Sequence, residues 1–68
     1  MKEIDARGLS CPEPVMLTKQ ALDAGEAELT VMVDNGAAKE NVSRQAKSHG
    51  KTATVEQNAD GDFIIHIK

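Results

Sequence analysis

The spacing of apolar residues changes repeatedly along this chain between the period of a strand and that of a helix. Apolar and polar residues alternate, as they do in half-buried strands, in segments 2–7, 28–34, 52–57 and 62–68. Apolar residues instead recur every three or four positions, as on the buried face of a helix, in segments 12–24 and 37–49. Gly25 and Gly50 follow the two helical segments, where glycine commonly ends a helix. The pattern predicts the element order βαβαββ.

This order favours a two-layer α/β sandwich, in which a four-stranded mixed sheet carries both helices on one face. Right-handed crossovers after the first two strands put both helices on the same side, and the Asn58–Gly61 turn makes a terminal hairpin. The other face of the sheet should then be open to solvent, with outward side chains from Thr30, Met32, Thr54, Glu56, Ile64 and His66. Met32 and Ile64 are either scattered apolar surface or part of a partner-binding face.

The length of 68 residues with a single cysteine predicts one small domain over residues 1–68, stabilised by packing alone. One thiol can form neither an internal disulfide nor a zinc site with several cysteines, and we expect no metal and no cofactor. The core should be aliphatic, because Phe63 is the single aromatic residue. A domain of this size leaves little room for a deep cavity, so any chemistry should lie on its surface.

The charge balance argues against an ordinary nucleic-acid-binding protein. Eight Lys and Arg residues against 11 Asp and Glu residues give a net charge of −3, and stacking aromatics are lacking. The sequence has neither the long apolar run of a membrane span nor the apolar stretch of a secretory signal at its start. We therefore expect a cytosolic protein whose thiol stays reduced.

Cys11 is the residue most suited to chemistry. It precedes Pro12, and a residue before proline favours the extended backbone of a helix N-cap. The positive end of the helix dipole there favours a thiolate, and Pro12 and Pro14 make the helix start rigid. Arg7 would add positive charge beside the sulfur and Glu13 would oppose it, and the sequence leaves the balance open.

The alternative for Cys11 is an inert buried thiol, but its place in a turn outside both apolar faces disfavours this interpretation. A Cys-His pair is also disfavoured, because His49 and His66 are expected at the opposite edge of the sheet. Thiolate nucleophilicity alone remains, as in thiol exchange or carriage of sulfur as a persulfide.

The run from Asp5 to Val15 contains Cys-Pro-x-Pro and resembles the signature of the TusA/SirA/YedF family of small sulfur-carrier proteins. The segment from Val33 to Val42 is most similar to the YedF branch, which is linked to selenium metabolism and often has a second domain. The resemblance implies that this chain is either a free-standing member or a piece of a longer one.

The same resemblance implies a βαβαββ fold and a Cys11 that accepts sulfane sulfur, or selenium, as a persulfide. It also implies a donor of the cysteine desulfurase or rhodanese type and an acceptor protein. Three residues at the start of the second predicted helix could form a docking rim, or serve only in capping and turns: Asp34, Asn35 and Lys39. The alternative function is a regulatory protein-interaction module that transfers no sulfur.

Overall fold

The computed structural model describes residues 2–9 and 13–68, and its element order confirms the predicted βαβαββ. The elements are β1 (Lys2–Asp5), α1 (Glu13–Asp23), β2 (Leu29–Val33), α2 (Gly36–Ser48), β3 (Ala53–Gln57) and β4 (Phe63–Ile67). Their ends lie within two residues of the predicted segments wherever the structure describes both. The local periodicity therefore identified every element in this part of the chain.

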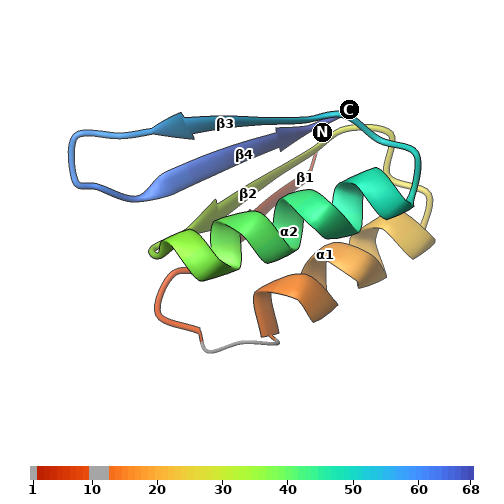
Figure 1. Ribbon diagram of the computed structural model, residues 1–68. Helices are drawn as coiled ribbons and strands as arrows, with labels where there is room; N and C mark the ends of the chain where they lie inside the picture. The colour runs from red at the N-terminus through yellow and green to blue at the C-terminus, as the bar shows by residue number, and fades with distance from the viewer. Residues whose placement is uncertain (1, 10–12) are drawn as a thin grey trace.

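The four strands form one mixed sheet in the order β1-β2-β4-β3. Strands β1 and β2 are parallel, whereas β4 runs antiparallel to both of its neighbours. Both helices cover one face of this sheet, which confirms the predicted two-layer sandwich (Figure 1). The terminal hairpin returns β4 to the centre of the sheet and leaves β3 at its edge.

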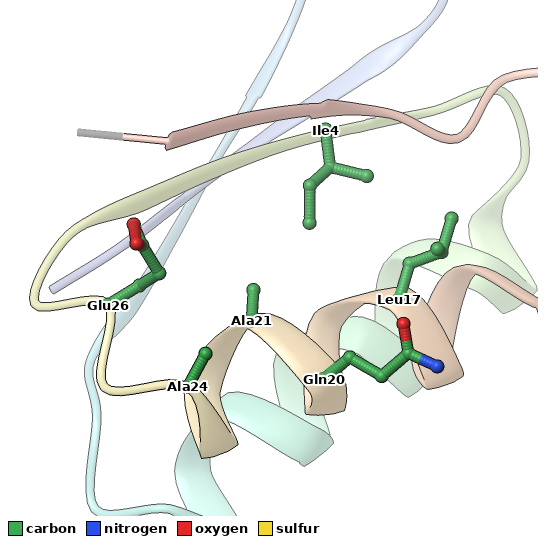
Figure 2. A pocket seen from close by; sticks show the side chains of 6 residues that line it. All are labelled: Ile4, Leu17, Gln20, Ala21, Ala24 and Glu26. Atoms are coloured by element: carbon green, nitrogen blue, oxygen red, sulfur yellow. The ribbon is translucent and has the colours of Figure 1, made fainter.

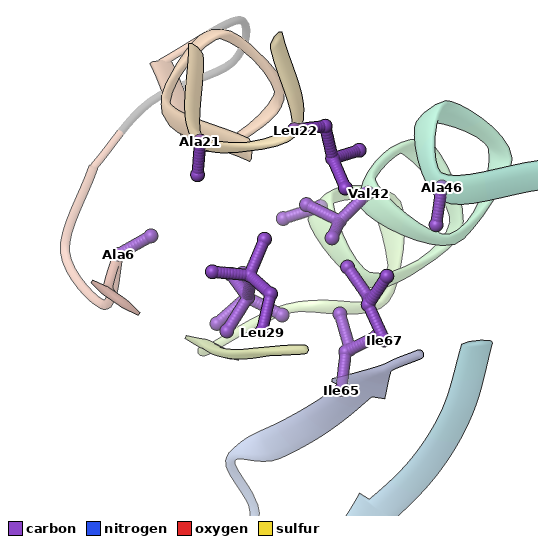
Figure 3. Packing of buried hydrophobic residues seen from close by; sticks show 11 residues of the cluster. Ala6, Ala21, Leu22, Leu29, Val42, Ala46, Ile65 and Ile67 are labelled. Carbon is purple, nitrogen blue, oxygen red and sulfur yellow. The ribbon is translucent and has the colours of Figure 1, made fainter. Parts of the chain in front are cut away.

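The core lies between the helices and the sheet and is aliphatic, as predicted (Figure 3). Alternate residues of the two central strands and one stripe of α2 supply most of the fully buried aliphatic residues: Leu29, Val31, Val33, Val42, Ala46, Ile65 and Ile67. Helix α1 contributes Ala21 and Leu22, which Figure 3 shows pointing toward the sheet and α2. Burial of these aliphatic side chains is the main stabilising contribution to the fold.

The uncovered sheet face is less exposed along its central strands than the sequence predicted. Thr30 is only 9% exposed, and Met32, Ile64 and His66 are half-buried. Thr30 stands in register between Glu3 and His66, and its Oγ1 lies 3.5 Å from His66 Nδ1. Neighbouring strands thus cover the central side chains, whereas Thr54 and Glu56 on edge strand β3 are exposed as predicted.

Candidate functional site

The candidate site lies at the edge of the sheet where β1 and β2 end and both helices begin, here called the helix-start edge (Figure 1). Its described residues are Arg7 to Leu9, Glu13, Pro14, Asp34, Asn35 and Asp62. Cys11 and Pro12 lie outside the described residues, so the N-cap role of Cys11 and the helix-start role of Pro12 remain predictions. The structure does describe the chain on both sides of them.

The approach to Cys11 begins with a tight turn after β1. The Leu9 N–H donates to the Ala6 carbonyl oxygen at 3.3 Å, and Gly8 between them has a φ of +80°. Positive φ at the third residue of a four-residue turn favours glycine because a side chain would be strained there. Ala6 itself is buried and its N–H donates to the Met32 carbonyl at 2.8 Å. The turn is therefore fastened to the sheet at its first residue.

Asp34 fixes the same turn from the end of β2. Its Oδ2 accepts the Gly8 N–H at 2.7 Å, and its Oδ1 accepts the Asn35 side-chain amide at 3.1 Å. The Gly8 N–H is the main reason that the pKa of Asp34 lies below its usual value, followed by the Asn35 amide. A residue of the predicted docking rim thus holds the turn that leads toward Cys11.

Asn35 is the N-cap of α2, which fits the capping alternative. Its backbone is extended, and its Oδ1 accepts the Ala38 N–H at 2.8 Å. Two adjacent residues therefore have different roles: Asp34 holds the turn after β1, and Asn35 caps the start of α2.

Two carboxylates hold the side chain of Arg7. Its Nε and Nη2 each lie 2.9 Å from an oxygen of Asp5, and its Nη1 lies 3.2 Å from Asp62 Oδ2. The side-chain hydrogen bonds from Arg7 lower the pKa of Asp5 to about 2, and the pKa of Arg7 is raised by the same pairing. Arg7 therefore belongs to a charge-paired cluster at the helix-start edge, and its effect on the thiol stays a prediction.

Sequence reasoning missed the roles of Asp5 and Asp62 at this edge. The Asp5-x-Arg7 spacing was a usable signal, because side chains two residues apart on an extended chain point to the same side. Asp62 is separated from Arg7 by 55 residues, and no local pattern predicts that contact. The contact also brings the end of the Asn58–Gly61 turn to the helix-start edge.

Pro14 anchors the start of α1 in the core. It is fully buried, and its carbonyl accepts a hydrogen bond from the buried Thr18 Oγ1 at 2.9 Å. Glu13, one residue before it, is exposed in the first turn. Burial of Pro14 fixes the direction in which α1 leaves the segment that contains Cys11.

The last predicted rim residue, Lys39, packs on a ring. Its Nζ lies 5.2 Å from the centre of the Phe63 ring, within the range of a cation–π contact. His49 lies at the far end of α2, where its Nε2 is 3.0 Å from Asp23 Oδ1. His66 lies near the end of β4, so both histidines are at the edge opposite the candidate site, as predicted.

A hollow of about 280 Å³ between β1 and α1 offers no alternative centre for thiol chemistry (Figure 2). Ile4, Leu17 and Ala21 point into it, and among the residues that the structure describes its lining contains one carboxylate, that of Glu26, and no nucleophile. Within residues 2–9 and 13–68 no cluster of three metal-ligating side chains occurs. The same residues form no helix with the length and apolar character needed to span a membrane.

Comparison with known families identifies the chain. The model of the family described as sulfurtransferase TusA matches residues 2–68, nearly the whole sequence. The chain belongs to the TusA family. Its resemblance to this family in the Cys-Pro-x-Pro region therefore extends over the complete fold.

Relatives of this TusA family member agree with that assignment. A protein of Methanocaldococcus jannaschii, named provisionally as a sulfur carrier protein, is 41% identical over 100% of this chain and 93% of its own length. A Bacillus subtilis protein named in the same provisional way, YrkI, is 35% identical over 93% of this chain and 85% of its own length. The crystal structure of a SirA-like protein from Desulfitobacterium hafniense superposes with a TM-score of 0.91 at 36% identity, covering 98% of this chain and 95% of that one.

Proposed function

We propose that this protein is a sulfur carrier in which Cys11 accepts sulfane sulfur as a persulfide and passes it to a partner protein. Membership of the TusA family carries this proposal, and the sulfur-carrier names of two relatives support it. The fastened turn at Gly8 and the buried Pro14 are consistent with a thiol presented on the surface rather than in a pocket. We place the carrier in the cytosol, where thiols stay reduced.

The transfer needs no outside oxidant. The Cys11 thiolate attacks the terminal sulfur of a donor persulfide, a new bond forms between Cys11 Sγ and that sulfur, and the donor leaves as a thiolate. An acceptor thiolate then attacks the same terminal sulfur, and Cys11 departs as a thiolate. We propose a cysteine desulfurase or rhodanese as donor, and selenium as an alternative cargo in the same two steps.

Intact-mass spectrometry after incubation with a desulfurase and cysteine tests the proposal. We expect a gain of about 32 Da that reductant reverses and that is absent in Cys11→Ala. Glu28→Gln is the control, because it makes the same type of change at an exposed residue before β2, at the opposite edge of the sheet, and should keep the gain. Selenocysteine in place of cysteine tests selenium as cargo.

Absence of any mass gain with desulfurase, rhodanese or selenium donors would contradict the carrier role. If Cys11→Ala also kept its cellular activity, the protein would instead be an interaction module. The two outcomes separate the carrier from its alternative because only the carrier needs the thiol.

A further inference from the structure

We infer that the open edge of strand β3, next to the basic side chains of α2, binds an extended, acidic segment of a partner protein, which adds to the sheet beside β3. The inference does not depend on Cys11 and would stand if no sulfur were transferred. It rests on three independent features: unpaired strand backbone, uncovered apolar surface and positive charge without carboxylate partners.

The first feature is the free backbone of β3. Thr52 and Lys68 exchange both backbone hydrogen bonds, at 2.9 and 3.0 Å, which fixes the alternation along the β3–β4 pair. Every second residue from Thr52 therefore bonds to β4, and the residues between them direct their N–H and C=O groups to the open edge: Ala53, Val55 and Gln57. Such an edge can pair with an added strand.

The second feature is the part of the inner sheet face that the helices leave uncovered. Val55 is in register with Ile65, which is buried, yet Val55 itself is 40% exposed. Helix α2 contacts β3 but leaves the Val55 side chain partly uncovered. Figure 1 shows β3 as the strand farthest from α1, with α2 the nearer helix. An added strand would cover Val55 on the side of the sheet that faces α2.

The third feature is the charge on α2. Lys39, Arg44 and Lys47 form no ion pair with any carboxylate within residues 2–9 and 13–68. They line a hollow of about 360 Å³ together with Ser43 and the single carboxylate Glu40. By contrast, Arg7 and Lys19 are each paired with aspartate. Lys51 and Lys68 also form no ion pair among the described residues, but three unpaired cations gather on one surface of α2.

These three features together indicate which kind of partner binds beside β3. Lysine and arginine beside an unpaired strand edge suit acidic side chains on an extended chain, which can meet the cations while its backbone pairs with β3. RNA would use the cations, but it would not use the strand edge, and the single aromatic ring, Phe63, is half-buried beneath Lys39 and not exposed for bases to stack on.

A second copy of the chain fits less well. Antiparallel pairing of two β3 strands about a two-fold axis would extend the sheet and put both α2 helices on the same side of it. Their uncompensated cations would then face each other across the joint, which is unfavourable. A partner with the opposite charge has no such cost.

The test uses the intact protein and an acetylated, amidated octapeptide in which threonine and glutamate alternate. The same peptide with lysine in place of glutamate is the control. We expect the acidic peptide alone to shift the amide NMR signals of β3 and α2 and to slow hydrogen exchange at Ala53, Val55 and Gln57. High salt should weaken the binding.

Two variants separate the backbone and charge contributions. Val55→Pro removes an outward N–H without breaking the β3–β4 ladder, and it should abolish detectable binding. Lys47→Glu should weaken binding about three- to tenfold, whereas Lys68→Glu, with the same change in net charge on the other sheet face, should change it less than about twofold. Amide spectra of the free variants check that each is folded.

Several results would overturn the inference. One is the absence of shifts in β3 and α2 at about 2 mM peptide, because edge pairing with matched charges should bind tightly enough to be detected at that concentration. Equal binding of both peptides, or unchanged binding by Lys47→Glu and Val55→Pro, would also exclude it. Binding of an oligouridylate to α2 without binding of the acidic peptide would exclude it as well. A dimer in sedimentation that blocks the β3 edge would have the same consequence.

Discussion

The two ends of the helical layer are fastened by different kinds of bond. At the far end, α1 and α2 both close through backbone hydrogen bonds around a glycine of positive φ. The Gly25 and Glu26 N–H groups donate to the carbonyls of Leu22 and Ala21, and Gly50 and Lys51 repeat the arrangement at the end of α2. At the helix-start edge, by contrast, side-chain carboxylates hold the chain.

The different bonds at the two ends of the helices indicate different roles for these ends. Backbone closure satisfies the last carbonyls of each helix locally and presents no reactive group. Carboxylates at the helix-start edge instead fasten Gly8 and Arg7 from distant parts of the chain, on the approach to Cys11. We therefore expect damage at the far end to affect stability alone, and damage at the helix-start edge to affect thiol reactivity as well.

The largest expected effects come from replacing matched glycines at the two ends. Gly8 and Gly50 have φ values of +80° and +74°, and a Cβ at either would meet no atom within 4 Å. Gly8→Ala and Gly50→Ala should therefore each lower the free energy of unfolding by about 1–2 kcal/mol through backbone strain alone, measured by urea denaturation. Only Gly8→Ala should also slow alkylation of Cys11 by iodoacetamide, by about threefold or more. Equal alkylation rates in the two variants would remove the distinction between the ends.

A smaller effect is expected from Asp34→Ala. The Gly8 N–H loses its 2.7 Å acceptor, so its hydrogen exchange should accelerate roughly tenfold. Asn35→Ala is the comparison, since it should accelerate exchange chiefly at Ala38 and change Gly8 much less, because it keeps the Asp34 carboxylate and removes only the amide that donates to its other oxygen. Because the folded-state pKa of Asp34 is lowered, the protection should be present above its unfolded pKa and be lost as pH falls through the folded value. Unchanged exchange at Gly8 in Asp34→Ala would show that the carboxylate does not hold the turn.

The smallest effect should come from the ion pair that joins the helices at the far end. The hydrogen bond to Asp23 raises the pKa of His49, so the folded state binds the proton more tightly than the unfolded state. This stabilisation is fully present below the unfolded pKa of histidine and is lost as pH rises through the higher folded value. The urea midpoint should fall slightly across that range in the parent protein, and the fall should be absent in His49→Gln. A rising midpoint, or an equal fall in His49→Gln, would refute this role.

The sequence by itself determined the elements, the apolar faces that bury them and the family signature around Cys11. These features depend on residues a few positions apart, and neighbours in sequence suffice to encode a strand or helix period and its glycine ends. The inward stripe at Ala38, Val42 and Ala46 is an example that the structure confirms.

Only the tertiary structure decided the central position of β4, the burial of Thr30 and the partners of Gly8 and Arg7. The Gly8–Asp34 and Arg7–Asp62 contacts span 26 and 55 residues. Such contacts depend on which strands become neighbours, and strand order follows from packing of the whole sheet rather than from any local pattern. The same strand order left β3 at the edge of the sheet and beside the cations of α2.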